Sequence, residues 1–458
     1  MNKIILQQSQ KHRLLFILLC FVLFTTSCTD DNNHQESLET AQYQPDYLIA
    51  HFEQLCHLIK DTDGFFPPQA ARVYGYVGLA NYEAVVHGIK GAISMQSQLN
   101  GFSSVTLPKP EKDQVYNWAI ASNAATAKMM RHMFEKRLNA SITFKIDSVE
   151  NTNNILLSFG HSQDVVDRSK IFGQQIADAI FEYSKTDGGH ESYLDPFQLP
   201  FSGPTDEFCW IPTNATLTPL SPKWGKNRPF LTQNITHTHP GPPVAFSTDP
   251  NSEFYKEAMV VYNQVKNNTT EEIAIANYWA DDPYKTCTPA GHTFNILLQL
   301  LKDEKVSLAK ASVGIAKMSI AENDAFIACW KTKYEYFLLR PVTYIQKYID
   351  PTFTTVLGSP PFPTYTSGHS CEVGAGSRIL ISLFTDGSGD YQFTDYSQLH
   401  HGYNARSFSS FTEMANECAN SRLYGGIHYP MDNSKGLHTG RAVGDNVNNL
   451  IQWPVFVR

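Results

Sequence analysis

Residues 70–86 read AARVYGYVGLANYEAVV, and this stretch carries the clearest information about the fold. Drawn as a helix, it is apolar around most of its circumference, with one arginine and one glutamate among small and aromatic residues. A helix of that kind is buried on all sides rather than lying on a surface. The stretch therefore predicts a central helix with other helices packed around it.

Further helices are predicted along the rest of the chain, because apolar residues recur at helical spacing and strand-like alternation is scarce. They span residues 47–60, 112–137, 142–159, 165–183, 253–266, 271–279, 292–301, 306–344, 369–384, 411–424 and 432–452. The longest segment between them, residues 186–250, is rich in Pro, Gly, Thr and Asn, which is typical of an irregular connection near a site or a partner surface. The predicted fold class is all-α, a large helical bundle with long irregular connections.

The composition is that of a globular protein, with 458 residues, of which 42% are hydrophobic and 17% are charged. The formal net charge of −8 argues against a general nucleic-acid binder. An anion-binding site in such a protein must be built locally by gathering Lys and Arg. The simplest organisation is one helical domain over residues 43–458, with the core of the site at about residues 278–450.

The first 27 residues are predicted to be a signal peptide. Basic residues precede an apolar run at 14–24, which is too short to span a membrane. Small residues then lead to Cys28, which resembles the lipid-acceptor cysteine of a bacterial lipoprotein signal; the alternative is a secretory signal that leaves Cys28 unmodified. Residues 28–42 are polar and are predicted to be a tether. We therefore expect an exported protein, either an outer-membrane lipoprotein or periplasmic, with membrane contact only through a lipid on Cys28.

Six cysteines follow this leader: Cys56, Cys209, Cys287, Cys329, Cys371 and Cys418. They show no paired short spacing, so a zinc site is not expected. Two interpretations of these cysteines stay open, disulfides in an exported protein and buried free thiols.

The first of three polar clusters contains Lys333 and Arg340, seven residues apart. In one continuous helix this spacing would put both cations on the same face, together with Trp330 and Phe337. Pro341, directly after Arg340, would kink or break that helix. Such a pair is most often a solvated surface, but the aromatic neighbours favour a partly buried one.

The second cluster is Ser367-Gly368-His369, at the end of the run PPFPTYTSGH over residues 360–369. The prolines exclude helix before it, so the cluster is predicted at a helix N-terminus, where unpaired backbone N–H groups and the helix dipole favour an anion. Gly368 permits close approach of the backbone to a ligand, and His369 could exchange a proton with it. On its own, this cluster would be read as an ordinary serine N-cap.

The third cluster joins Arg422, which offers a planar fork of donors to an oxyanion, to His428. Asp432 comes four residues after His428 and could accept a hydrogen bond from one ring nitrogen, leaving the other free as a ligand or nucleophile. The alternative is a surface histidine with Asp432 as a local helix cap.

Taken in this order and spacing, the three clusters make the chain similar to the superfamily that joins type 2 phosphatidic-acid phosphatases with vanadium-dependent haloperoxidases. The resemblance covers about residues 278–435 and agrees with the helical fold. In the phosphatases it implies that His428 attacks phosphorus and His369 protonates the leaving group, with no cofactor. In the haloperoxidases the same pocket holds vanadate.

For a haloperoxidase, the resemblance implies that His428 is the single covalent protein ligand of vanadate. Charge on the vanadate oxygens would be neutralised by Lys333, Arg340 and Arg422, and hydrogen bonds would come from Ser367 and the Gly368 N–H. His369 would act as acid–base, and Lys333 would polarise peroxide, which then oxidises iodide, bromide or chloride to hypohalous acid.

Three further resemblances favour the haloperoxidase branch over a phosphatase of phosphomonoesters or lipid phosphates. Trp330 and Phe362 match aromatic positions on the halide side of chloroperoxidase-type sites. Residues 278–282, YWADD, resemble a segment whose last aspartate, here Asp282, pairs with Arg422. Residues 71–85 resemble a helix of bacterial haloperoxidase-like proteins, and this resemblance is consistent with an iodoperoxidase-like member.

Two other interpretations explain fewer of the sequence features. A non-catalytic surface lipoprotein, such as a glycan-binding module, would account for the aromatic-bearing segment 186–250 but not for the anion-site residues. A second metal site at His237-Thr238-His239 or His400-His401 would need partner ligands at matching spacing, so solvated loop histidines are the preferred interpretation.

Overall fold

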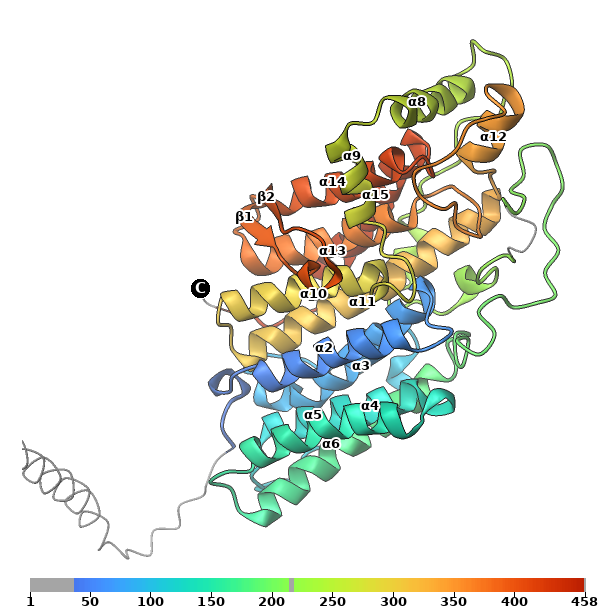
Figure 1. The fold of residues 1–458 in the computed structure, drawn as a ribbon. Coiled ribbons are helices and arrows are strands. Elements are labelled where there is room, and N and C mark those ends of the chain that lie inside the picture. The colour runs from blue at the N-terminus through green and yellow to red at the C-terminus, as the bar shows by residue number, and fades with distance from the viewer. Residues whose placement is uncertain (1–36, 214–217, 457–458) are drawn as a thin grey trace, which may run out of the picture. The chain divides into compact units, whose positions relative to one another are not determined.

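The computed structural model describes residues 37–213 and 218–456 (Figure 1). The predicted signal peptide, Cys28 and residues 28–36 of the tether lie outside the described residues. The last part of the tether, residues 40–42, forms a short 3-10 helix in which Thr40 is buried and donates a hydrogen bond to the Val85 carbonyl. The folded domain therefore includes residues 40–42, which lie just before its predicted start at residue 43.

The protein is all-α, as predicted, with 59% of the described residues in helices and 4% in strands. The N-terminal helices are α2 (Asp46–Asp61), α3 (Pro67–Val85), α4 (Trp118–Met133), α5 (Ala140–Leu157) and α6 (Gln163–Ser184). The middle of the chain forms α7 (Gln233–Thr236), α8 (Glu253–Asn267), α9 (Thr270–Tyr278), α10 (Thr288–Asp303) and α11 (Leu308–Tyr336). The rest forms α12 (Pro341–Tyr348), α13 (Gly368–Phe384), α14 (Phe411–Tyr424) and α15 (Pro430–Leu450).

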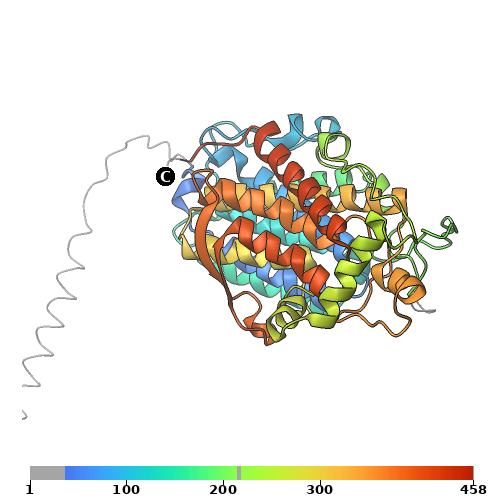
Figure 2. The same cartoon turned by 90° about the horizontal axis from the view of Figure 1, so that it is seen from above.

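Helix α3 is the central helix that its sequence predicts. Every residue from Pro68 to Val85 is buried, and the helix packs against α11 on one side and α4 on another. In Figure 1 the long helices run roughly parallel in layers, with α2–α6 below, α10 and α11 in the middle, and α13–α15 above. Seen from above in Figure 2, the C-terminal helices, in red and orange, lie in front of the N-terminal helices, in blue and cyan. The site lies where α11 ends and α13 and α15 begin.

The predicted helix over residues 306–344 is wrong, because the chain breaks into α11 and α12. Helix α11 ends at Tyr336, and Phe337 adopts a left-handed conformation with φ 49°. Pro341 then opens α12 as its first residue, with Arg340 as the extended N-cap residue before it. Lys333 and Arg340 therefore do not share a helix face, and the turn between them brings them to the site from two elements.

The long irregular connection is confirmed. Between α6 and α8 the described residues contain the four-residue helix α7 and one 3-10 turn. The buried carboxylate of Asp324 in α11 pins this segment, since it accepts hydrogen bonds from Phe230 N, Leu231 N and Asn234 Nδ2 at 2.8–2.9 Å. The connection also reaches the site, because the Leu220 carbonyl accepts a hydrogen bond from Trp330 Nε1 at 3.3 Å.

A small antiparallel hairpin was not predicted. It consists of β1 (Asp390–Asp395) and β2 (Arg406–Ser410), in which Phe393 pairs with Phe408. The two phenylalanines are buried and pack against the end of the helical core. Among residues 37–213 and 218–456, the structure has no helix with the length and apolarity needed to span a bilayer.

Helices α13 and α15 approach each other unusually closely because of glycines on α15. A Cβ atom at Gly440 would lie 1.9 Å from the Cys371 carbonyl oxygen, and one at Gly436 would lie 2.8 Å from Ser370 Cβ. Both contacts are shorter than van der Waals packing allows, so only glycine fits there. The N-termini of these two helices carry His369 and Asp432, so this contact sets their separation.

Candidate active site

Five elements bring the predicted residues together. Lys333 lies in the last turn of α11 and Arg340 caps α12, while Ser367 caps α13. Arg422 lies in the last turn of α14, and Asp432 lies in the first turn of α15. All five are buried. Residues spread over a hundred positions thus converge in one place.

The ammonium group of Lys333 is fully buried and held by the backbone. Its Nζ donates to the carbonyls of Pro363 and Thr364 at 3.0 and 2.9 Å, and it lies 5.0 Å from the centre of the Phe362 ring. Burial lowers the pKa of Lys333 to about 8, because an ammonium loses its hydration there. Any anion bound beside it would favour the charged form.

The guanidinium of Arg340 is fixed by the turn before His428. Its Nε donates to the Phe362 carbonyl and its Nη1 to the Ile427 carbonyl, both at 2.9 Å. The same Nη1 lies 3.2 Å from Nε2 of His428, and Nη2 is buried with no hydrogen-bond partner among the described residues. Burial and the neighbouring Arg422 lower the pKa of Arg340. The group therefore has a free donor directed away from its backbone contacts.

His428 is held so that its Nε2 keeps a lone pair, which accepts from Nη1 of Arg340 at 3.2 Å. Its Nδ1 lies 2.9 Å from Oδ2 of Asp432 and 3.1 Å from Oγ1 of Thr364. The Thr364 hydroxyl also donates to Asp432, and the Tyr429 N–H donates to the same carboxylate at 3.0 Å. Because Nδ1–H donates to a carboxylate, Nε2 is left with its lone pair. Burial and the charges of Arg340 and Lys333 push the pKa of His428 well below its usual value, so the ring is neutral and can act as a ligand.

Asp432→Asn is expected to lower activity by roughly 10- to 100-fold, the usual cost of losing the carboxylate that orients a ligating histidine. The amide keeps the shape but loses the charge that selects the tautomer of His428. Steady-state kinetics would measure the loss. Asp445→Asn makes the same chemical change farther along α15, at a half-exposed pair with Arg378, and is expected to leave activity intact; equal effects of the two variants would contradict this role for Asp432.

The second cluster lies at the N-terminus of α13, as predicted. The Ser367 side chain caps the helix by accepting from Ser370 N at 3.3 Å. The N–H groups of Gly368 and His369, at the first two helical positions, have no acceptor within the helix. His369 forms a hydrogen bond with the backbone of Ala280, and its buried Nε2 has no partner among the described residues. Burial and Arg422 lower the pKa of His369 well below its usual value, so the ring is neutral.

Arg422 reaches the site, but the predicted pairing with Asp282 is not formed. Its Nη1 donates to the Trp279 carbonyl at 2.7 Å, and its buried Nε has no partner among the described residues. Asp282 is about half exposed and pairs instead with Lys285 at 2.9 Å. The two aspartates of YWADD face opposite ways, and it is Asp281 that turns inward.

A buried network behind this segment was missed by the sequence analysis. His292 of α10 lies between Asp281 and Asp395, with Nδ1 and Nε2 at 2.9 and 3.0 Å from their carboxylates. The His292 ring also stacks on Trp279 at 4.5 Å. The two carboxylates outweigh burial and raise the pKa of His292 well above its usual value. The network fixes residues 279–281, whose backbone contacts Arg422 and His369. In the sequence, the only indication of this network was a histidine, His292, in an otherwise apolar helix.

The aromatic residues line the same side of the site as Lys333. The rings of Trp330 and Phe362 are 5.0 Å apart, and Phe362 also lies 4.9 Å from the guanidinium carbon of Arg340. Trp330 is buried and Phe362 is partly exposed. Both predicted aromatic positions are therefore beside the cations, with Phe362 toward the outside.

The donor set fits a compact oxyanion. At the site, three buried nitrogens lack partners among the described residues, namely Arg340 Nη2, Arg422 Nε and His369 Nε2. An unpaired buried donor is costly, and a charged one more so. An oxyanion bound at His428 Nε2 would accept from the two guanidinium donors, offset three buried cations and be able to exchange a proton with His369 Nε2. Vanadate and phosphate both meet this description.

The other histidine pairs do not form a metal site within the described part of the chain, where no group of three or more His, Cys, Asp or Glu residues could hold a metal ion. His239 lies 3.2 Å from Glu335 of α11, whereas His400 and His401 line a separate cavity.

Comparison with known proteins agrees with this geometry. Residues 314–455 match the family described as the VCPO second helical-bundle domain. The crystal structure of a bacterial vanadium-dependent iodoperoxidase superposes with a TM-score of 0.79 and 32% identity, covering 91% of this chain and 99% of that one. No curated protein matches significantly.

More distant structures share the fold. The holo form of a bacterial vanadium-dependent chloroperoxidase is 14% identical, with a TM-score of 0.63 over 86% of this chain and 95% of that chain. The apo form of such an enzyme is 15% identical, with a TM-score of 0.64 over 83% of this chain and 92% of that chain. The fold, the converging site and the match over nearly the whole iodoperoxidase chain agree: the protein belongs to the vanadium-dependent haloperoxidases, enzymes that oxidise halides with peroxide.

Proposed function

We propose that the site binds vanadate at Nε2 of His428 and that iodide is the preferred halide. The observation that supports vanadate is the arrangement around that nitrogen, a neutral imidazole lone pair 3.2 Å from Arg340 among unpaired buried donors. When bound, vanadate supplies a Lewis-acidic metal that activates peroxide without changing its own oxidation state.

The chain's residues divide the remaining work. Lys333, Arg340 and Arg422 offset the anion's charge, and the Gly368 N–H and Ser367 hydroxyl offer hydrogen bonds at the start of α13. His369 Nε2 takes a proton from hydrogen peroxide as it enters and returns one to a departing water. Lys333 can donate to a peroxide oxygen, since the two backbone carbonyls that it contacts leave it a third N–H.

Iodide is proposed for two reasons. Trp330 and Phe362 form an aromatic wall beside the cations, and such a wall excludes water and suits a large, weakly hydrated halide better than a small one. The similar enzyme at 32% identity is an iodoperoxidase.

Titrating the apoprotein with orthovanadate tests the proposal. Iodide oxidation by peroxide should rise from background and saturate at one vanadate per chain, and kcat/KM for iodide should exceed that for bromide. Inorganic phosphate should compete with vanadate. Full halide oxidation in the apoprotein would contradict the vanadate assignment, and a higher kcat/KM for bromide would contradict the iodide assignment. Hydrolysis of a phosphomonoester by the apoprotein would favour the phosphatase alternative.

We also propose that the enzyme is exported and anchored by a lipid on Cys28, on the basis of the leader-like N-terminal sequence. Mass measurement of the mature N-terminus would show either an acylated Cys28 or another first residue.

A further inference from the structure

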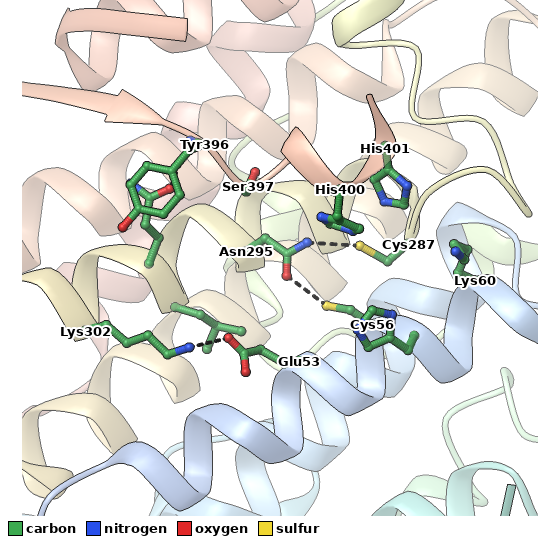
Figure 3. A pocket seen from close by; sticks show the side chains of 13 residues that line it. Glu53, Cys56, Lys60, Cys287, Asn295, Lys302, Tyr396, Ser397, His400 and His401 are labelled. Carbon is green, nitrogen blue, oxygen red and sulfur yellow. Dashed lines mark hydrogen bonds and ion pairs between the residues drawn. The ribbon is translucent and has the colours of Figure 1, made fainter. Parts of the chain in front are cut away.

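A second cavity lies away from the anion site, between α2, α10 and the turn that follows β1 (Figure 3). Its volume is about 350 Å³, and its lining includes Cys56, Cys287, Asn295, His57, His400 and His401. None of the residues assigned to halide oxidation lines it. Two of the six cysteines within the described residues thus face one hollow.

The two thiols are neighbours from distant parts of the sequence. Cys56 lies in α2, and Cys287 is the residue directly before α10. The Cys56 thiol donates to Asn295 Oδ1 at 3.2 Å, and Asn295 Nδ2 lies 3.4 Å from the Cys287 sulfur, as the dashed lines in Figure 3 show. Tyr74 OH donates to the Cys56 sulfur at 3.2 Å. Contact with Cys56, followed by burial, raises the pKa of Cys287 well above its usual value.

A second thiol pair provides a contrast. Cys329 of α11 and Cys371 of α13 share the Thr366 hydroxyl, which lies 3.7 and 3.3 Å from their sulfurs. Both are fully buried at 0% exposure, whereas Cys56 and Cys287 are 5% and 4% exposed and line the cavity. The two pairs therefore differ in access to a small oxidant that enters from solvent.

We propose that Cys56 and Cys287 are a built-in oxidation site, where hypohalous acid made by the enzyme joins the two thiols in a disulfide. The inference rests on halide oxidation itself, whichever halide the enzyme prefers. Protonated thiols react poorly with peroxide, which needs a thiolate, but their sulfur lone pairs attack an electrophilic halogen.

The chemistry balances with the oxidant that the enzyme produces. The sulfur of one thiol attacks the halogen, an S–halogen bond forms, the O–halogen bond breaks, and the thiol proton leaves with hydroxide as water. The second sulfur then attacks the first, halide leaves, and the proton of the second thiol passes to solvent. The two thiols lose two electrons and the halogen gains them, so halide is returned. The bond covalently ties α2 to the start of α10.

Peptide mapping tests the proposal. The reduced full-length protein would be treated with one equivalent of reagent hypobromous acid, alkylated and digested with trypsin without reductant. Trypsin cuts after Lys285 and Lys302, so residues 286–302 carry Cys287; a second cut after Glu53 by a Glu-specific protease leaves Cys56 on residues 54–60, apart from Cys20 and Cys28 of the same tryptic peptide. We expect these two peptides to appear joined, at a mass two hydrogens below their sum. Alkylation of both cysteines, or their separate oxidation to sulfonic acids, would overturn the proposal.

Turnover and variants sharpen the test. The same joined peptide should accumulate in the holoenzyme given iodide and peroxide, and fall several-fold when halide is omitted; equal yields would exclude hypohalous acid as the oxidant. Cys329→Ser should keep the joined peptide, whereas Cys56→Ser should abolish it. If Cys56→Ser fails to fold, the wild-type map still decides. Reductant should lower the Tm of the oxidised protein, because the bond closes the long loop from residue 56 to 287.

Discussion

His428→Ala is expected to lower kcat/KM for halide oxidation by at least about 100- to 1,000-fold, the scale on which a single preorganised group contributes to transition-state stabilisation. The variant loses the Nε2 lone pair beside Arg340 and leaves the site's three cations without a central partner. Because the variant lacks the proposed vanadate ligand altogether, the affinity for vanadate should fall together with activity. Equilibrium dialysis with orthovanadate and steady-state kinetics measure the two effects separately.

The matched control for this variant is His438→Ala, an exposed histidine farther along α15. It should keep full activity and vanadate binding. The His428→Ala protein should still fold, since alanine removes a buried ring but neither backbone contact of Arg340. A folded His428→Ala protein with wild-type turnover would show that the ligand is another residue.

Arg340→Ala is expected to weaken vanadate binding roughly 30-fold to several thousand-fold, which corresponds to about 2–5 kcal/mol for truncating a buried, hydrogen-bonded charge. The guanidinium contacts His428 and the carbonyls of Phe362 and Ile427. Its loss leaves the buried Ile427 carbonyl without this donor, at about 1–3 kcal/mol, and removes a partly buried hydrogen bond to the Phe362 carbonyl. We therefore expect a lower Tm as well as weaker binding.

Arg340→Lys separates charge from geometry. Lysine restores the positive charge but cannot reach the two carbonyls and the anion at once, because it lacks the planar fork. Its affinity should fall between those of wild type and Arg340→Ala, as measured by calorimetry with phosphate on the apoproteins. Arg378→Ala, at a partly exposed ion pair with Asp445, is the control. Unchanged anion affinity in both Arg340 variants would remove Arg340 from the site.

Much of the fold could be predicted because apolar residues recur at helical spacing in most of its helices. Helix α3 shows this best, since its apolar circumference has one explanation, burial on every side. Most predicted helices appear within a few residues of their predicted bounds, but the helix predicted over residues 112–137 is shorter, with α4 spanning Trp118–Met133. The hairpin was harder, since β1 and β2 have few apolar residues and depend on the pairing of Phe393 with Phe408 across a loop.

The site residues could be predicted from their motifs, but the backbone path that brings them together could not. Periodicity alone extends α11 past Tyr336, because it gives no sign that Phe337 turns left-handed. Pro341 marked the break within a few residues, yet a proline can kink a helix as well as end it. The two cations therefore meet through a reversal of the chain rather than along one helix face.

The choice between Asp281 and Asp282 could not be made from the sequence either. Adjacent residues in an irregular segment face different ways, and which one is buried depends on partners more than ten residues away, here His292 and Asp395. The match to an Asp–Arg pairing selected Asp282. The structure gives Arg422 a backbone carbonyl from the same segment instead.

The close contact between α13 and α15 has a consequence for altering this enzyme. A single methyl group at Gly440 would push the two helices apart, and the spacing between the rings of His369 and His428 would widen with them. Reaction geometry is thus encoded partly in positions that never meet the reactants. Mutations restricted to residues that line the site would leave this helix spacing unchanged. Mutations along α15 would reduce activity without altering any residue that contacts the reactants.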